Sequence, residues 1–244
     1  MRRHQIFSKI LRFMGARLTP GGQFGLHMTL GVLIMIVSVP VFGNIADEVT
    51  DQDAITVLDV HIANWFNTHH VEPYTSFLLF ISFVHKVGGM ILLVAAFGYY
   101  LGRRQQRYWL LALGVTVLPG MILNVVLKQV FQRSRPLFEE PLVTLSTYSF
   151  PSGHTAAATL FYGVLACYIM IACKGWSVRL ATAAFCVVMI FLVAFSRVYL
   201  GAHYLSDVLA AMASSAAWLA VCITAISTLR RRSEARSLAA NGTM

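Results

Sequence analysis

Charge is scarce in this 244-residue chain: Asp, Glu, Lys and Arg together make up 12% of it, whereas hydrophobic residues make up 57%. A soluble domain carries about 25% charged residues, so a soluble globular fold is excluded. Cysteine is also rare. The four cysteines form no Cys-x-x-Cys pair and lie in or beside apolar segments, which favours buried core thiols. No internal repeat or low-complexity segment occurs, which indicates a single domain over residues 1–244.

Long apolar segments, in contrast, are abundant. A helix needs about 20 apolar residues to cross the hydrocarbon core of a membrane. Six segments are long enough, namely residues 25–43, 76–101, 108–130, 153–172, 178–196 and 203–229. His85-Lys86 and Gly88-Gly89 interrupt the second segment, which predicts a short outer helix followed by a shorter span. The chain is therefore predicted to be all-α, an integral membrane bundle of six transmembrane helices.

Two amphipathic segments accompany the first span. Residues 1–18 place apolar side chains on one helical face and Arg and Lys on the other, which predicts an N-terminal interfacial helix that anchors the chain. The acidic connection at residues 44–75 repeats apolar residues at helical spacing; they are Ile55, Val57, Leu58, Ile62, Trp65 and Phe66. This spacing predicts a second helix on the outer membrane surface, and we expect it to serve packing more than substrate binding.

The net charge of +9 is distributed unevenly along the chain. If six spans alternate in direction, 14 of the 19 Lys and Arg residues fall on one side of the membrane and nine of the ten acids on the other. The positive-inside rule then places both termini in the cytoplasm of a multi-pass protein of the inner (plasma) membrane. This placement indicates a membrane protein rather than a nucleic-acid-binding protein, and no obligate protein partner is predicted.

Residues capable of phosphate chemistry lie at the predicted outer ends of the spans. The first block holds Lys128 and Arg135, which are seven residues apart and share one face if the helix continues. Pro136 predicts that the helix ends at Arg135. Both cations can bind phosphate oxygens, or they can serve only as membrane-surface anchors. Arg133 fits the anchoring role better.

The second block, Ser149 to Thr155, opens the fourth span. Ser152 can cap the helix or bind an anion, and Gly153 lets the backbone approach a ligand closely. Free backbone amides at the start of a helix attract anions. His154 follows about one residue inside the helix. The alternative is an ordinary helix cap followed by an interfacial histidine.

The third block, Ser196 to Asp207, is the most specific of the three. His203 and Asp207 are four residues apart at the start of the sixth span, so the carboxylate can accept a hydrogen bond from Nδ1 and leave Nε2 free to attack phosphorus. Arg197 precedes His203 across a short outer turn. Ionisable groups in a membrane span indicate function, and a purely structural His–Asp pair is the alternative.

Together the blocks match the pattern K-x6-RP, PSGH and SR-x5-H-x3-D, and the chain resembles the type 2 phosphatidic acid phosphatase (PAP2) superfamily over about residues 76–229. Within that family it looks like the bacterial lipid phosphatases. The resemblance implies that His203 attacks phosphorus, Asp207 orients it and His154 protonates the leaving oxygen. It also implies that five residues hold the phosphate oxygens: Lys128, Arg135, Ser152, Gly153 and Arg197. No cofactor is expected. No further cluster of histidines or carboxylates could hold a divalent metal, so we expect a metal-independent reaction.

The resulting prediction is a membrane phosphatase that hydrolyses a lipid phosphomonoester or pyrophosphate at the outer leaflet through a phosphohistidine. The resemblance suggests phosphatidylglycerophosphate, phosphatidic acid, undecaprenyl pyrophosphate or lipid A as substrates. One alternative is a phosphotransferase that uses a carrier pyrophosphate as donor and a glycolipid as acceptor. A transporter or lipid scramblase is the rival from another class, and the complete set of motif residues argues against it. Substrate choice is expected to depend on the interrupted second span and on the 44–75 connection. His85-Lys86 is interpreted either as a substrate contact or as a membrane anchor.

Overall fold

The computed structural model describes residues 26–241, and within them the chain forms helices and no strand. The helices are α2 (Leu26–Thr50), α3 (Ala54–Thr68), α4 (Tyr74–Val84), α5 (Val87–Arg103), α6 (Arg107–Phe131), α7 (Gly153–Ala172), α8 (Trp176–Tyr199) and α9 (Leu205–Asn241). The predicted all-α class is confirmed. The interfacial helix predicted at residues 1–18 lies outside the described residues.

Five of these helices are long and apolar enough to cross a membrane, namely α2, α6, α7, α8 and the part of α9 up to Glu234. The pair α4 and α5 passes the same test together, with a bend of 59° between them, which makes up to six spans. The predicted interruption at His85-Lys86 is confirmed, because α4 ends at Val84 and α5 begins at Val87. α2 runs beyond the predicted end of its span at residue 43 and continues to Thr50.

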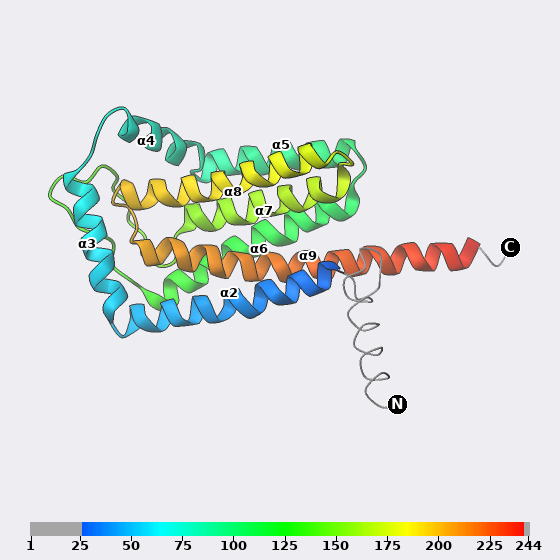
Figure 1. Ribbon diagram of the computed structural model, residues 1–244, viewed down its shortest axis with the longest axis horizontal. Coiled ribbons are helices and arrows are strands. Elements are labelled where there is room, and N and C mark those ends of the chain that lie inside the picture. The colour runs from blue at the N-terminus through cyan, green and yellow to red at the C-terminus, as the bar shows by residue number, and fades with distance from the viewer. Residues whose placement is uncertain (1–25, 242–244) are drawn as a thin grey trace, which may run out of the picture.

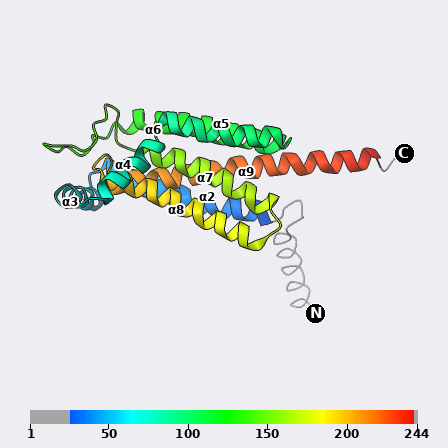
Figure 2. The same ribbon diagram turned by 90° about the horizontal axis from the view of Figure 1, so that it is seen from above.

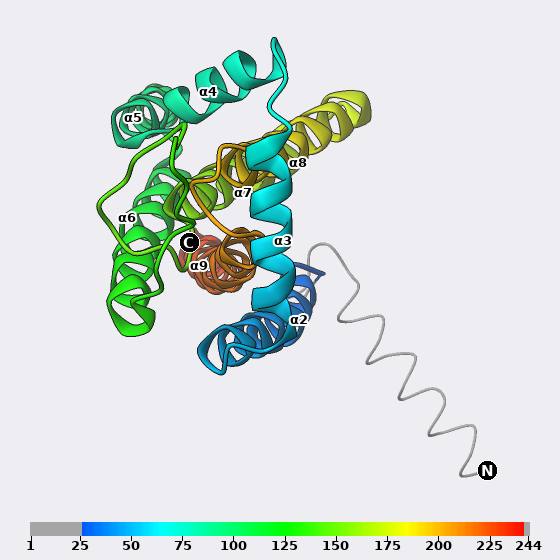
Figure 3. The same ribbon diagram turned by 90° about the vertical axis from the view of Figure 1, so that its left-hand side faces the viewer.

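α7 is the central helix of the bundle (Figure 3). It packs against α6, α8 and α9, and α5 and α8 lie on opposite sides of it (Figure 2). Its first half contributes a continuous buried stretch from Thr155 to Tyr162 that includes three small residues, Ala156, Ala157 and Ala158. Small side chains allow transmembrane helices to approach closely. α7 therefore presents its N-terminus at the centre of one end of the bundle.

α2 and α3 enclose the bundle from outside. α2 packs along α9 and turns Leu33, Ile36 and Val37 outward, as expected for a helix that faces lipid. α3 crosses one end of the bundle, over the ends of α2, α8 and α9 (Figures 1 and 3). The helix predicted within the 44–75 connection is thus present. Its residues Ile62 and Phe66 pack against buried residues of α8 and α9.

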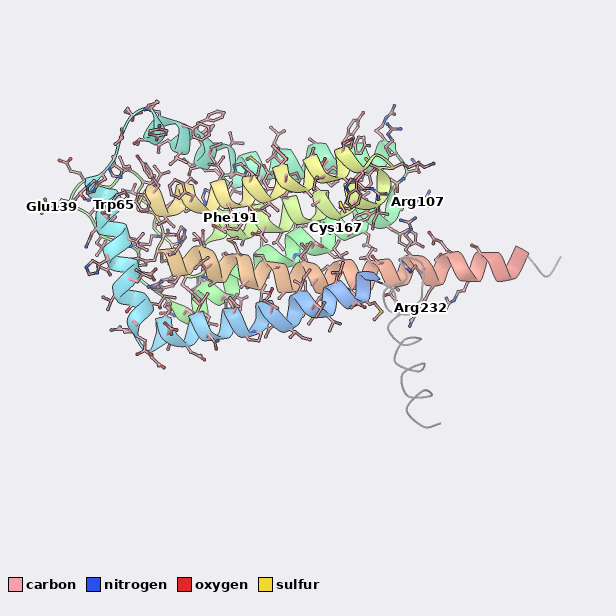
Figure 4. All side chains as sticks on the ribbon, viewed as in Figure 1. Trp65, Arg107, Glu139, Cys167, Phe191 and Arg232 are labelled. Carbon is pink, nitrogen blue, oxygen red and sulfur yellow. The ribbon has the colours of Figure 1, made fainter. Side chains whose placement is uncertain are left out.

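The two ends of the bundle differ in the residues they carry. Figure 4 shows Glu139 and Trp65 at the end that α3 covers, and Arg107 and Arg232 at the opposite end. The long connection between α6 and α7, residues 132–152, lies at the α3 end. The three sequence blocks therefore meet at one end of the molecule, opposite the arginine-rich end.

Candidate active site

The connection after α6 departs from the predicted geometry. α6 ends at Phe131, where Gln132 adopts a left-handed backbone conformation with φ of 45° that terminates the helix. The backbone amide of Ser149 then donates to the carbonyl of Arg133 over 2.8 Å and ties the two ends of the connection together. The prediction that the helix ends at Arg135 is wrong, and the condition under which Lys128 and Arg135 would share a helical face is not met. Arg135 reaches the site from an irregular segment instead.

His203 and Asp207 form a buried pair, as their spacing predicts. His203 Nδ1 lies 3.3 Å from Asp207 Oδ2, and both side chains are almost completely buried. The same oxygen accepts the backbone amide of Tyr204 over 2.9 Å and the hydroxyl of Ser149. The bond to Tyr204 is half of a capping box, in which a carboxylate in the first helical turn returns to the N-cap amide. The start of α9 therefore fixes Asp207 locally.

The turn that carries His203 is tightly constrained. Gly201 has a φ of 64°, and a Cβ there would lie 2.6 Å from the ring of Phe138. Both the conformation and the lack of space therefore require glycine. The backbone amides of Ala202 and His203 donate to the carbonyl of Arg197 at the end of α8. This turn holds His203 in a fixed position relative to Arg197.

Arg135 lies against Nε2 of His203, the ring nitrogen that faces away from Asp207. Its Nη1 is 3.1 Å from His203 Nε2 and 2.6 Å from the carbonyl oxygen of Ala202, and its Nε donates to the carbonyl of Thr147 over 2.6 Å. An arginine can only donate, so Nε2 is the acceptor and Nδ1 carries the proton that faces Asp207. This tautomer leaves the lone pair of Nε2 pointing toward the guanidinium.

Burial keeps the imidazole of His203 neutral. It lowers the pKa of His203 to about 3, against the opposing effect of the hydrogen bond and charge of Asp207. The nearby cations Arg135 and Arg197 lower the pKa further. At neutral pH the imidazole is therefore unprotonated at Nε2, which is the state that a nucleophilic histidine requires.

The start of α7 brings the second block to the same place. The amide of Ser152 donates to the backbone carbonyl of Asp207 over 3.0 Å, which fastens the N-terminus of α7 to α9. Ser152 occupies the N-cap position, but its side chain makes no capping hydrogen bond; its hydroxyl accepts one from Thr155. The capping role considered for Ser152 is therefore not observed. Gly153 follows beside Lys128 and Asn124.

Two side chains at the site have buried polar atoms that lack a partner among the described residues. They are Nε2 of His154, and Nε and Nη2 of Arg197. Arg197 is buried almost completely, and only its Nη1 is bonded, to the hydroxyl of Ser82. His154 lies close enough to Arg197 and His203 for electrostatic interaction. Buried donors without a partner are costly, so this arrangement is suited to an anion that supplies the missing acceptors.

Lys128 completes the cluster of cations. Its Nζ donates to the carbonyl oxygens of Tyr148 and Ser149 over 2.6 and 3.1 Å. It also interacts electrostatically with Arg135, Asp207 and Arg197. The structure therefore brings together all of the predicted site residues at the α3 end of the bundle. Among the described residues, no group of three or more His, Cys, Asp or Glu could hold a metal ion.

Four contributing residues were not predicted from the sequence: Arg133, Asp59, Ser149 and Ser82. Arg133 was interpreted as a membrane-surface anchor, but it forms ion pairs with Asp59 and Asp207. Burial lowers the pKa of Arg133, yet the two carboxylates outweigh this effect and raise it above its ordinary value. The sequence does contain a signal for Asp59, because this acid lies on the otherwise apolar helical face of Ile55, Ile62 and Phe66, where a charge is expected to have a buried partner. Ser149 and Ser82 carry no comparable signal.

The break between α4 and α5 lies close to this cluster. His85 is buried, with Nδ1 bonded to the carbonyl of Ile81 and Nε2 to the hydroxyl of Tyr162 at 2.8 and 2.9 Å. Lys86 is exposed, and its Nζ lies 5.5 Å from the centre of the Phe83 ring. His85 therefore serves packing between helices, whereas Lys86 is available to a headgroup.

Replacing Lys86 by alanine is expected to change KM between different lipid substrates more than it changes kcat. The exposed ammonium can contact a distal headgroup but has no contact with His203. Steady-state kinetics on two or more lipids test this. A loss of kcat as deep as that of a His203 variant would contradict it.

The structure is a helical membrane bundle with a buried His–Asp pair and several cations at one end. These features define an integral membrane enzyme with a site suited to an anionic group. The chain belongs to the PAP2 superfamily, whose family model matches residues 109–231. The resemblance inferred from the sequence is confirmed.

Two relatives from Bacillus subtilis share part of the sequence. A 90-residue stretch, 36% of this chain, is 41% identical to phosphatidylglycerophosphatase B and covers 43% of that protein, less than half of its length. A 153-residue stretch, 59% of this chain, is 29% identical to the undecaprenyl-diphosphatase BcrC and covers 71% of that protein.

Two crystal structures share the fold. The PAP2-type phosphatidylglycerolphosphate phosphatase from Bacillus subtilis matches with a TM-score of 0.66 and 24% identity, over 79% of this chain and 93% of that chain. LpxE from Aquifex aeolicus matches with a TM-score of 0.54 and 21% identity, over 71% of this chain and 95% of that chain. At these identities the likeness shows the shared architecture alone.

Proposed function

We propose that this protein removes phosphate from a lipid phosphomonoester or pyrophosphate at the outer leaflet, through a phosphohistidine on His203. The observation that carries the proposal is the set of buried atoms of Arg197 and His154 that lack a partner among residues 26–241, beside the His203–Asp207 pair. A phosphoryl group placed there would satisfy the donors of Arg197 and lie within reach of His203. Membership of a lipid phosphatase family and the names of the two relatives support a phosphatidylglycerophosphate or undecaprenyl pyrophosphate substrate.

The first chemical step transfers the phosphoryl group to the enzyme. Nε2 of His203 attacks phosphorus, the bond from phosphorus to the lipid oxygen breaks, and His154 donates a proton to that oxygen. Arg135 must leave Nε2 for this attack, and its guanidinium is then free to bind a phosphate oxygen. Arg197, Lys128 and the amides at Ser152 and Gly153 stabilise the remaining charge of the loose transition state.

The second step regenerates the enzyme. A water molecule attacks the phosphohistidine, His154 accepts a proton from that water, and inorganic phosphate leaves. Throughout both steps Asp207 accepts the hydrogen bond from Nδ1–H of His203. Its negative charge stabilises the positive charge that the ring carries while it is phosphorylated. Apart from the substrate and the attacking water, every role in both steps is assigned to a side chain or backbone amide of this chain.

The test is an assay of inorganic phosphate released by the purified protein in detergent, with EDTA present. The substrates are phosphatidylglycerophosphate, phosphatidic acid, undecaprenyl pyrophosphate and lipid A, each supplied without an acceptor lipid. Release from the first or third substrate supports the proposal. Transfer of phosphate onto an added glycolipid, with no release of inorganic phosphate in its absence, would favour the phosphotransferase alternative. No reaction of any lipid with or without the acceptor would contradict both.

We further propose that the site faces away from the cytoplasm and that both termini are cytoplasmic. The arginine-rich end of the bundle, opposite the site, fits the positive-inside rule. A cysteine introduced by Glu139→Cys is expected to react with a membrane-impermeant maleimide in intact cells or spheroplasts. The control is Arg107→Cys, at the opposite end, which should react only after permeabilisation. The reverse labelling pattern would contradict this orientation.

A further inference from the structure

Arg133 links the catalytic pair to a helix outside the three sequence blocks. Its Nη1 donates to Asp207 Oδ1 over 2.7 Å, and its Nη2 donates to Asp59 Oδ2 over 2.8 Å. Asp59 belongs to α3, and its side chain is about as buried as that of Asp207. One guanidinium therefore bridges two buried carboxylates, one of which contacts the nucleophile.

Asp59 is itself held firmly. It accepts the backbone amide of Ser206 over 2.9 Å and the hydroxyl of Ser206, in the first turn of α9. The ring of Tyr204 packs against Arg133, with the guanidinium carbon 4.4 Å from the ring centre, a favourable cation–π arrangement. The guanidinium of Arg133 therefore has partners on α3 and on α9. The bonds from Ser206 to Asp59 fasten α3 to the residues that flank Asp207.

The two oxygens of Asp207 have different partners. Oδ2 accepts from Ser149 and Tyr204 and faces Nδ1 of His203, whereas Oδ1 is held by Arg133. A carboxylate held at one oxygen alone can rotate about its side-chain bond. Because Arg133 holds the other oxygen, it fixes the plane of the carboxylate and directs Oδ2 at the imidazole. Arg133 thus acts on His203 indirectly, by orienting the carboxylate that contacts it.

Charge balance gives Asp59 its own part in this arrangement. Arg133 carries one positive charge and shares it between two carboxylates, so the three groups together remain negative. If Asp59 were neutral, the guanidinium would pair with Asp207 alone and weaken the attraction between Asp207 and a positively charged, phosphorylated His203. The cost of desolvating buried charges offsets much of their mutual attraction, so we expect this ion pair to fix the geometry more than to stabilise the fold.

We propose that Arg133 is a positioning residue that orients Asp207 toward His203, and that Asp59 of α3 is its counter-charge. This inference rests on the proposed function, since it assigns Arg133 and Asp59 an effect on phosphoryl transfer at His203. It also gives the 44–75 connection a catalytic role in addition to packing.

The experiment compares kcat and KM for lipid phosphate release by the full-length protein and its variants. Arg133→Gln is expected to lower kcat by about 10- to 100-fold, the range typical for loss of a residue that orients a directly acting group, while KM changes by less than about threefold. Arg133→Lys should recover only part of kcat, because an ammonium is a point charge that cannot bridge two carboxylates as a planar fork does. Asp59→Asn should lower kcat by a smaller factor than Arg133→Gln.

The double variant Asp59→Asn/Arg133→Gln distinguishes this role from general loss of stability. In this proposal Asp59 affects kcat through Arg133, whereas its bonds to Ser206 fasten α3 to α9. The double variant should therefore be no slower than Arg133→Gln alone. Thr75→Val is the matched control, since it removes a buried hydrogen bond of 3.0 Å to Tyr199 between α4 and α8; it should lower the melting temperature and leave kcat unchanged.

Three results would overturn the inference. They are a kcat of Arg133→Gln equal to that of the wild type, a loss confined to KM, and losses from Asp59→Asn and Arg133→Gln that multiply in the double variant. A wild type that releases no phosphate from any lipid would instead contradict the proposed function, so the two failures are distinguishable.

Discussion

Replacing His203 by alanine is expected to lower kcat for lipid phosphate release by at least about 10⁴-fold, because the variant lacks the atom that bonds to phosphorus. Nε2 is the nitrogen of His203 that can attack once Arg135 moves away, since Nδ1 faces the carboxylate at 3.3 Å. The lipid can still bind to Arg135, Lys128 and Arg197, so KM should change much less than kcat.

The control for this loss is His69→Ala, which removes an exposed histidine at the same end of the molecule, stacked on Trp65. It should keep wild-type kcat. Activity of His203→Ala within about tenfold of the wild type would contradict the assignment of His203 as nucleophile.

Replacing Arg197 by methionine is expected to produce opposite effects on activity and stability. Two of its donor atoms are buried without a partner among the described residues. Loss of these donors should lower kcat/KM by about 10²–10³-fold, as for other donors that stabilise transition-state charge. The ligand-free protein should nevertheless melt at least about 2 °C higher, because an apolar side chain of similar length replaces a buried cation.

Orthovanadate, a phosphate analogue, separates the two effects in a thermal-shift measurement. It should raise the melting temperature of the wild type, because it binds the folded state, and raise that of Arg197→Met much less. Arg230→Met is the control, since Arg230 lies on α9 beyond the bundle core and forms an exposed pair with Glu234. It should change neither activity nor the response to vanadate. A less stable Arg197→Met protein that keeps its vanadate response would show that Arg197 is structural.

The lengths and periodicity of the apolar segments predicted much of this fold. The break at His85-Lys86 was predicted correctly from the polar and glycine residues that interrupt the second apolar segment, and the helix α3 from the helical spacing of apolar residues. The end of α6 was not, because the left-handed conformation of Gln132 depends on how residues 133–149 fold back onto the site. Proline at position 136 limits the helix but does not specify where it ends.

The candidate site was predictable where its residues are close in sequence. The spacing of His203 and Asp207 places them on one helical face, and the structure pairs them. The partners Asp59 and Arg133 are 74 residues apart, and no local pattern connects them. A lone arginine near a membrane surface usually serves as an anchor, so only the packing of α3 across α9 reveals the ion pair.

The proposed phosphohistidine is tested most directly by trapping it. The protein is incubated briefly with ³²P-labelled lipid phosphate that carries a good leaving group, denatured, and analysed for protein-bound label that is stable to base and labile to acid. The account predicts label on the wild type and on His154→Ala, which retains the nucleophile, and none on His203→Ala. Label that persists on His203→Ala would contradict it.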